Sequence, residues 1–152
     1  MNTVETIAVE RSIWVATSRE KAWRAVTEPE QLNQWYATYY HWDIPNLQVG
    51  TTVKFYNKDD ANDMQVAKIE IVDKPHQFTV RWQPDKLYPA MTLVTSFMLE
   101  EENGGTRVTI SESGYEAIPA DERQQWLDAT GGGYSMSMEN LKAHLEGRPI
   151  PH

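Results

Sequence analysis

Glu112 is the ionisable residue whose place in the sequence most suggests chemistry. It follows Val108 and Ile110 at steps of two, so in a β-strand all three side chains point to one apolar face. A carboxylate there is costly unless it is hydrogen-bonded, paired or protonated. Two interpretations stay open: the strand end is solvated, or Glu112 is the polar anchor of a cavity and could act as a general acid or base. Arg81 and Arg107 are candidate partners, although strand alternation aims both away from it.

The other residues that commonly carry chemistry give no recognisable site. The four histidines His41, His76, His144 and His152 are scattered, without a second ligand at metal-site spacing. The absence of cysteine excludes disulfides, thiol catalysis and thiolate ligands. Neither a Gly-x-Ser-x-Gly motif nor a Gly-x-Gly-x-x-Gly motif occurs. The sequence therefore predicts no metal, no other cofactor and no activated nucleophile.

Aromatic residues are abundant, with six tryptophans and seven tyrosines. Such a surplus suits a cavity that holds an apolar ligand, although several of these rings must simply fill the core. Trp126 is expected beside the cavity, and Met136 is expected to be exposed. The residues predicted to bind a ligand are Trp35, Tyr39, Phe55, Trp82, Phe97, Glu112, Leu127, Gly131 and Tyr134.

A helix over residues 121–146 must position several of these groups. Its apolar residues recur at steps of three and four, and Pro119 and Gly147 suit its two ends. The triplet Gly131–Gly133 either separates two shorter helices or gives up side chains in one continuous helix where something comes close. The apolar stripe stays in phase across the triplet, which favours the continuous helix. We then expect Gly131 to keep space for a ligand, and Gly131→Leu to fill it without loss of stability. The stripe consists of Leu127, Gly131, Tyr134, Met138, Leu141 and Leu145.

Two short helices are expected after a first strand at residues 7–16. Thr17 and Thr27 are each followed three residues later by glutamate, which is the spacing of a capping box. Pro29 suits the first turn of the second helix.

Period-two alternation predicts the remaining strands. In the strand 63–72, Ala67, Ile69 and Ile71 are expected to share one face. Asn103-Gly104-Gly105 is a strong hairpin signal. Connections of this length make the sheet antiparallel, and the long helix must cover its apolar face. The predicted strands are 39–44, 51–56, 63–72, 77–83, 91–99 and 106–113.

The composition restricts the location and the partners. One domain is expected at residues 1–147, followed by a loose tail at 148–152. The net charge of −8 argues against nucleic acid and anionic membranes as partners. The chain has no apolar run of membrane-spanning length and no signal-peptide pattern, so it is expected to be cytoplasmic.

Six short motifs, in this order and spacing, resemble the START-like, or SRPBCC, superfamily. Within it they resemble the group named after the C-terminal domain of activators of the ninety-kilodalton heat-shock chaperone ATPase. The resemblance implies an α+β helix-grip fold, in which a curved antiparallel sheet of six to seven strands wraps the long helix and leaves a cavity. The motifs are residues 10–16, 23–35, 72–75 leading to Trp82, 104–114, 132–134 and 139–145.

Two positions depart from that group. Ser18 stands where proline is frequent, which we expect to be neutral. Tyr134 stands where tryptophan is frequent, which leaves a hydroxyl group pointing toward the implied cavity. We therefore expect the cavity to accept a ligand with a polar group.

Three functions stay open from the sequence. The leading one is a binding domain for a small apolar or aromatic molecule. The second is an enzyme like the aromatase/cyclases and hydrolases of the superfamily, with Glu112 as the acid–base group and Tyr134 orienting the substrate. The third is a co-chaperone or protein-interaction domain, which predicts an exposed apolar patch. A homodimer is compatible with each of them.

Overall fold

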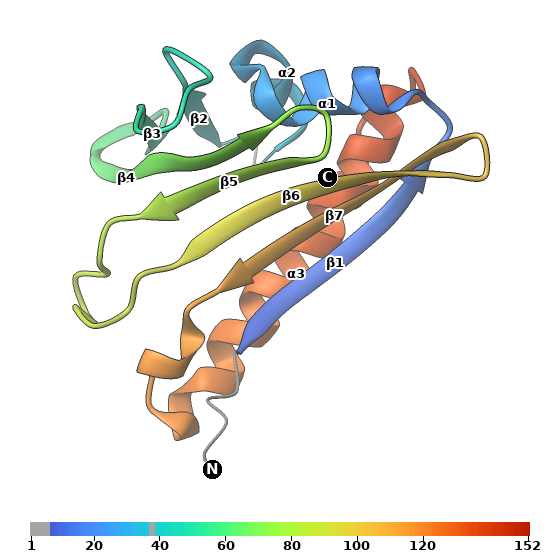
Figure 1. Ribbon diagram of the computed structural model, residues 1–152. Coiled ribbons are helices and arrows are strands. Elements are labelled where there is room, and N and C mark those ends of the chain that lie inside the picture. The colour runs from blue at the N-terminus through green and yellow to red at the C-terminus, as the bar shows by residue number, and fades with distance from the viewer. Residues whose placement is uncertain (1–6, 37–38) are drawn as a thin grey trace.

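A seven-stranded sheet curves around one long helix (Figure 1). The computed structural model describes residues 7–36 and 39–152. The strand order is β1-β7-β6-β5-β4-β3-β2, and every pair of neighbours is antiparallel. The predicted α+β helix-grip fold is confirmed. The elements are β1 (Ala8–Val15), α1 (Arg19–Thr27), α2 (Pro29–Trp35), β2 (Tyr40–Asp43), β3 (Thr52–Asn57), β4 (Asp60–Asp73), β5 (Gln77–Trp82), β6 (Val94–Glu102), β7 (Gly105–Ser113), the 3-10 turn η1 (Tyr115–Ala117) and α3 (Ala120–Leu145).

Helix α3 runs through the glycine triplet without a break. Its 26 residues correspond to a length of about 39 Å at 1.5 Å per residue. The interpretation as two shorter helices is therefore wrong. Gly147, with a φ of +73°, follows its end in the left-handed conformation that glycine adopts most easily.

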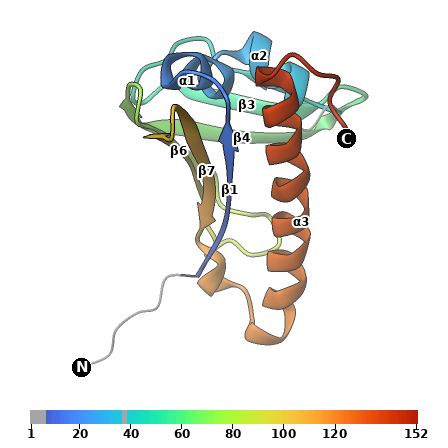
Figure 2. The same cartoon turned by 90° about the vertical axis from the view of Figure 1, so that its right-hand side faces the viewer.

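Helices α1 and α2 lie at the C-terminal end of α3 (Figure 2). The side-chain amide of Asn140 donates to the carbonyl oxygen of Trp35, which joins α3 to α2 at 3.1 Å. The N-cap of α1 is Ser18, whose hydroxyl accepts from the amide of Lys21, and not Thr17. Glu28 precedes α2, so Thr27 is not its cap; Thr27 instead ends α1 and donates to the carbonyl oxygen of Trp23.

A β-bulge in β4 changes which residues face the core. The pairing of β4 with β5 shifts between Ile69 and Ile71, and a bulge displaces the residues beyond it from strict alternation. Ile69 is therefore buried, whereas Ile71 is 37% exposed, which corrects the expected common face. The hairpin between β6 and β7 is as predicted, because Asn103 and Gly104 both have positive φ.

The C-terminal residues 148–152 are hydrogen-bonded to α3, so the tail is not loose. The amide of Arg148 donates to the carbonyl oxygen of Ala143 at 2.8 Å. The amide of His152 donates to the side-chain oxygen of Asn140 at 3.0 Å, and its imidazole lies 2.6 Å from the carboxylate of Glu139. In the described part of the chain, no helix is long and apolar enough to cross a membrane.

Candidate functional site

Glu112 is buried, and three hydroxyl groups surround its carboxylate. Its side chain lies on β7 and the residue is 9% exposed. The Tyr115 hydroxyl donates to one carboxylate oxygen at 2.5 Å. The hydroxyls of Thr95 and Tyr134 donate to the other, at 2.6 and 2.8 Å. The interpretation of Glu112 as a solvated strand end is therefore wrong. We call Thr95, Glu112, Tyr115, Thr130 and Tyr134 the hydroxyl–carboxylate network.

The three hydroxyl groups are placed so that each can donate to an oxygen of the Glu112 carboxylate. Tyr115 has one hydroxyl proton, and it donates this proton in its hydrogen bond to Glu112. In the 3.0 Å contact between Tyr115 and Thr130, the proton therefore comes from Thr130. The indole of Trp82 donates to the hydroxyl of Thr95 at 2.9 Å, which leaves the Thr95 proton for Glu112.

No cation within the described residues forms an ion pair with Glu112. The two candidate partners point elsewhere, as strand alternation requires: Arg81 pairs with Glu70 at 2.8 Å and Arg107 pairs with Glu102 at 2.8 Å. Hydrogen bonds from three hydroxyl groups therefore satisfy the buried Glu112 carboxyl group in place of an ion pair.

The carboxylate in turn affects the tyrosines around it. Burial, with the negative charge of Glu112 as the next cause, raises the pKa of Tyr36 and of Tyr115 well above the usual value. Burial also raises the pKa of Tyr134, and the neighbouring Tyr36 and Glu112 add to the effect. These hydroxyl groups therefore stay protonated, and they remain available as hydrogen-bond donors over the ordinary pH range.

An aromatic cluster lies next to the network. It consists of Tyr36 at the end of α2 together with Trp42, Phe55 and Trp82 from β2, β3 and β5. The ring centroids of Trp42 and Phe55 are 4.8 Å apart, and those of Trp42 and Trp82 are 5.8 Å apart. Tyr36 packs edge-on against Trp42 at 5.3 Å. Trp82 joins the two groups, because its ring belongs to the cluster and its N–H to the network.

The structure brings several predicted site residues together and separates others. Phe55 and Trp82 are half-buried in the cluster, whereas Trp35 and Phe97 are buried beneath Tyr36. Leu127 is half-buried on α3. Tyr39 is 78% exposed, so its side chain adds nothing to this packed group. The sequence analysis did not predict Tyr36, Trp42, Thr95 or Tyr115 as site residues. Only Trp42 could have been found, because alternation in its short strand places its side chain toward the core.

Gly131 faces the edge strand β1, and it does not face empty space. A Cβ atom added there would lie 2.4 Å from a guanidinium nitrogen of Arg11. This guanidinium also donates to the hydroxyl of Ser135 at 3.1 Å. The glycine therefore gives Arg11 room to cross the helix. The expectation that Gly131→Leu fills a void is wrong, because the new side chain must displace Arg11.

The opposite flank of α3 carries Trp126, Thr130, Gly133, Ser137 and Asn140, which lie within about 80° at 100° per residue. Trp126 packs edge-on against Tyr88 of the β5–β6 connection at 5.7 Å. Near the other end of this flank, Asn140 is bonded to α2. Between these contacts, a Cβ atom added at Gly133 would meet nothing within 4 Å. Gly133, and not Gly131, is therefore the glycine next to the apolar stripe that has free space beside it, whereas Gly132 lies on the exposed face.

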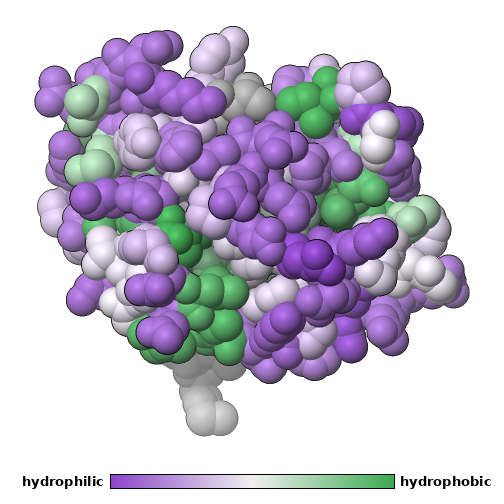
Figure 3. All heavy atoms as spheres, turned by 90° about the horizontal axis from the view of Figure 1, so that it is seen from above, coloured by the Kyte–Doolittle hydropathy of each residue, from purple (hydrophilic) through white to green (hydrophobic). Residues whose placement is uncertain are grey.

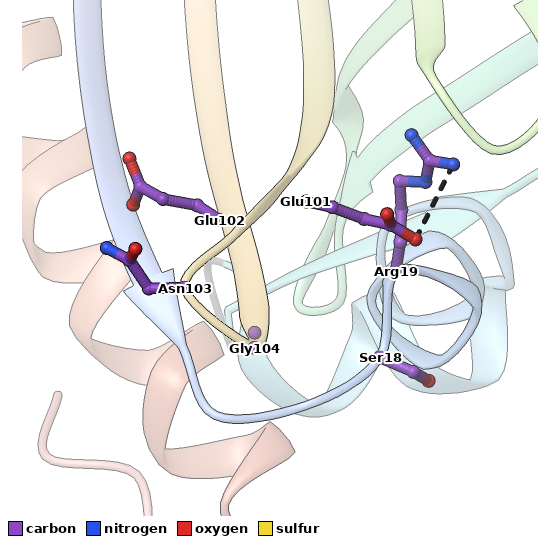
Figure 4. Close-up of a pocket in the computed structure, with 7 residues that line it drawn as sticks. Ser18, Arg19, Glu101, Glu102, Asn103 and Gly104 are labelled. Carbon is purple, nitrogen blue, oxygen red and sulfur yellow. Dashed lines mark ion pairs between the residues drawn. The ribbon is translucent and has the colours of Figure 1, made fainter.

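Two pockets of the described residues lie away from this flank. One, of about 400 Å³, is bounded by the start of α1 and the β6–β7 hairpin, where Arg19 pairs with Glu101 (Figure 4). The other, of about 320 Å³, lies between the α1–α2 region and the segment 44–47. Neither pocket is lined by α3, so the enclosed cavity between sheet and helix stays a prediction. Within the described ranges, no three His, Asp or Glu residues are grouped so that they could hold a metal ion.

The fold agrees with the family to which the sequence matches. The sequence profile of the family described as "Activator of Hsp90 ATPase homolog 1-like protein" matches residues 16–146. The chain therefore belongs to this family, and the predicted START-like resemblance is confirmed. A search of curated protein sequences gave no match.

Solved structures show the same fold at low sequence identity. The protein MLL2253 from Mesorhizobium loti has a TM-score of 0.75 and 21% identity, over 94% of this chain and 98% of that one. The protein SSP2350 from Staphylococcus saprophyticus has a TM-score of 0.72 and 20% identity, over 95% and 96% of the two chains. The Aha1 dimer from Colwellia psychrerythraea has a TM-score of 0.69 and 18% identity, over 92% and 96%. At these identities the comparisons establish the fold alone.

Proposed function

We propose that this domain binds a small apolar or aromatic molecule between the aromatic cluster and α3. The observation that carries the proposal is the contact of half-buried aromatic rings with a buried network of hydroxyl groups around one carboxylate. Aromatic surface with a few fixed polar groups is the usual lining of a small-molecule site. Phe55 and Trp82 supply the apolar surface, and Tyr134 and Glu112 supply the polar groups.

The flank around Gly133 is the proposed approach route. It lies between the Tyr88–Trp126 contact and the Asn140–Trp35 contact, and a Cβ atom added at Gly133 would meet no other atom within 4 Å. In Figure 2 the β5–β6 connection reaches toward the N-terminal half of α3, while α2 lies at the C-terminal end. A ligand that enters here passes Ser137, whose side chain is buried, before it reaches Tyr36 and the network.

The network would orient the ligand. A carboxylate offers about four lone-pair directions, and three are taken by Thr95, Tyr115 and Tyr134. The remaining direction can accept a hydrogen bond from a hydroxyl or amine group of the ligand. Since this acceptor is buried, a matching donor adds more to affinity than it would at the surface.

A matched pair of variants tests the route. The probe is the neutral dye N-phenylnaphthylamine, and binding is measured from its fluorescence. Gly133→Leu should weaken binding by more than about tenfold, because the leucine fills the approach route. Gly132→Leu places the same side chain on the exposed face, so it should bind like the wild type. Equal binding by both variants would show that the ligand does not pass this flank.

The function itself is tested on protein purified from its own cells. Native mass spectrometry should show a bound small molecule, and a thermal-shift screen of neutral lipophilic compounds should find stabilising ligands. Absence of both a copurified molecule and any stabilising lipophile rejects the proposed binding function.

A homodimer stays a prediction for this chain. The Aha1 from Colwellia psychrerythraea, which has the same fold, is described as a dimer. That description supports the prediction, and sedimentation velocity at several protein concentrations tests it. A single species with the mass of the monomer at every concentration would contradict it.

A further inference from the structure

Trp42 contains a buried hydrogen-bond donor without a partner. The residue is 1% exposed, and its indole nitrogen Nε1 has no partner in the described part of the chain. The backbone of the same residue is satisfied, because its amide donates to the side chain of Asn33 at 2.7 Å and its carbonyl oxygen accepts from it at 3.1 Å. The indole N–H is therefore the polar group of Trp42 that lacks a hydrogen-bond partner within the described residues.

Three other indole groups of this chain have hydrogen-bond partners. Trp35 donates its N–H to the carbonyl oxygen of Ala25 at 2.9 Å, and Trp14 donates to that of Glu102 at 2.7 Å. Trp82 donates to Thr95. Buried donors are almost always paired, because a donor that loses water and gains nothing is costly. Among the described residues the Nε of Arg19 is also unpaired, so the unpaired donor of Trp42 needs an explanation from its own position.

The position of Trp42 supplies one. Its ring contacts Tyr36, Phe55 and Trp82, which are the other members of the aromatic cluster and the surface on which the ligand is proposed to lie. These three neighbours are only half-buried, so a ligand that reorders them can reach the indole. The unpaired donor therefore lies within the surface on which the ligand is proposed to bind.

We propose that the indole N–H of Trp42 selects the ligand, and that the ligand is a neutral aromatic molecule with a hydrogen-bond acceptor at its buried end. A ketone, an ester carbonyl or a pyridine-type ring nitrogen has this chemistry. A carboxylate or phosphate does not fit, because the Glu112 carboxylate is connected to Trp42 through only two residues, Trp82 and Thr95, and would repel a second anion there. This inference rests on the proposed binding function and adds the chemical class of the ligand.

Three probes of similar size separate the alternatives: naphthalene without an acceptor, acetonaphthone with a neutral carbonyl, and naphthoate with an anionic carboxylate. Acetonaphthone should bind about tenfold more tightly than naphthalene, which is the effect of one satisfied buried donor. Naphthoate should bind most weakly. In ¹H–¹⁵N spectra, acetonaphthone should move the Trp42 indole proton downfield. The absence of this signal in Trp42→Phe assigns it.

The variants complete the test. In Trp42→Phe the preference for acetonaphthone over naphthalene should fall below about twofold. Trp14→Phe removes an indole whose N–H is already paired with Glu102, so it should keep the preference. If Trp42→Phe does not fold, the wild-type affinities and the indole shift decide alone.

The outcomes distinguish the two proposals. Equal affinity for naphthalene and acetonaphthone, with an unmoved Trp42 signal, overturns the role of Trp42 and leaves the binding function intact. Failure of all three probes to bind, together with no stabilising lipophile in the thermal-shift screen, overturns both.

Discussion

Glu112 joins four parts of the fold through its two carboxylate oxygens. It lies on β7 and accepts from Thr95 on β6, Tyr115 on η1 and Tyr134 on α3. These donors are neutral, so each keeps its proton and none brings a counter-charge into the core. A buried charge held in this way depends on every donor, because removal of one leaves part of the charge unsatisfied.

Tyr134→Phe should lower the free energy of unfolding by about 1.5–3 kcal/mol, the usual range for a hydrogen bond to a charged group. Phenylalanine keeps the ring packing and removes only the donor to Glu112. Urea denaturation measures the change. Tyr39→Phe is the control, since Tyr39 is 78% exposed, and it should change stability by less than about 0.5 kcal/mol. Equal stability of the two variants would show that the Tyr134–Glu112 bond contributes nothing.

The raised pKa values of Tyr36, Tyr115 and Tyr134 predict a stability that is lost in alkali. A phenol with a higher pKa in the folded state than in the unfolded state favours folding below the unfolded value, near 10. That contribution is lost as the pH rises toward the folded value. Phenolate absorbance should therefore appear in two phases, the second together with unfolding seen by circular dichroism. Tyr134→Phe should reduce only the second phase, whereas one phase that precedes unfolding would contradict the prediction.

Strand alternation was sufficient to predict that the Glu112 side chain points toward the core. It was not sufficient to predict which residues form hydrogen bonds with its carboxylate. Its donors Thr95, Tyr115 and Tyr134 come from three other elements, and their meeting depends on strand register and on the depth of α3. The unpaired donor of Trp42 is likewise invisible in the sequence, because an indole looks the same whether or not its nitrogen finds an acceptor.

Among the elements, α3 has two different flanks. One is fixed to β1 by long polar side chains: Arg11 donates to Ser135, and Lys142 donates to the carbonyl oxygen of Trp14 at 2.9 Å. The other carries the open position at Gly133. The glycine triplet therefore combines three environments: contact with β1, the exposed face, and the proposed approach route.

Gly132→Ala should raise the free energy of unfolding by about 0.4–1 kcal/mol, because alanine is the better helix former and its methyl group meets nothing. Gly131→Ala should be less stable than Gly132→Ala by about 0.5–1.5 kcal/mol, since it displaces Arg11 from Ser135. Chemical denaturation of the two variants in parallel measures both values. Equal gains would mean that Arg11 moves aside without cost.

Leu141→Ala should cost about 2–5 kcal/mol, as is usual for a leucine removed from a packed core. The side chain is fully buried on the stripe of α3, near the closed end of the molecule where α2 packs. Met136→Ala is the control, because Met136 is 46% exposed on the opposite face. A loss below about 0.5 kcal/mol for Leu141→Ala would contradict the packing described for this helix.

The order and type of the elements were predictable because helix and strand periods are local properties. Their details were not. The cap of α1 moved by one residue from Thr17 to Ser18, since both can accept from a backbone amide. The bulge that exposes Ile71 depends on how β4 pairs with β5, and nothing in the sequence of β4 alone marks it.

Over the whole molecule, Glu146 ties together regions far apart in sequence. Its carboxylate accepts from Lys142 at 2.8 Å, from Arg148 at 2.9 Å and from the amide of Ala16 at 3.3 Å. The end of α3, the C-terminal segment and the end of β1 therefore meet at one side chain.

The third hypothesis from the sequence, a co-chaperone or protein-interaction domain, predicts a broad exposed apolar patch. The face shown in Figure 3 is mostly hydrophilic, and its apolar atoms lie in separate groups. This face therefore gives no support to that hypothesis.

The hydrogen bonds from Lys142 and Arg148 hold the pKa of Glu146 down at about 2. Because this value lies below the ordinary 4.5, the contribution of Glu146 to stability is fully present above about pH 4.5 and is lost as the pH falls toward about 2. Glu146→Gln should therefore lose less stability across this window than the wild type. Urea denaturation at a series of pH values measures it. Glu30 is an exposed glutamate of α2, so Glu30→Gln should lose as much stability across this pH range as the wild type. If Glu146→Gln also loses as much stability as the wild type, Glu146 is not the source of this pH dependence.

The strand order also decides how this sheet is protected from aggregation. Its two outer strands are β1 and β2, and an unpaired strand edge can recruit another chain. β2 has four residues, too few for a stable new pairing. β1 is longer, but it presents the exposed polar run Glu10-Arg11-Ser12, and α3 runs alongside it (Figure 2). The ligand entry proposed here would thus leave neither sheet edge free for pairing with another copy.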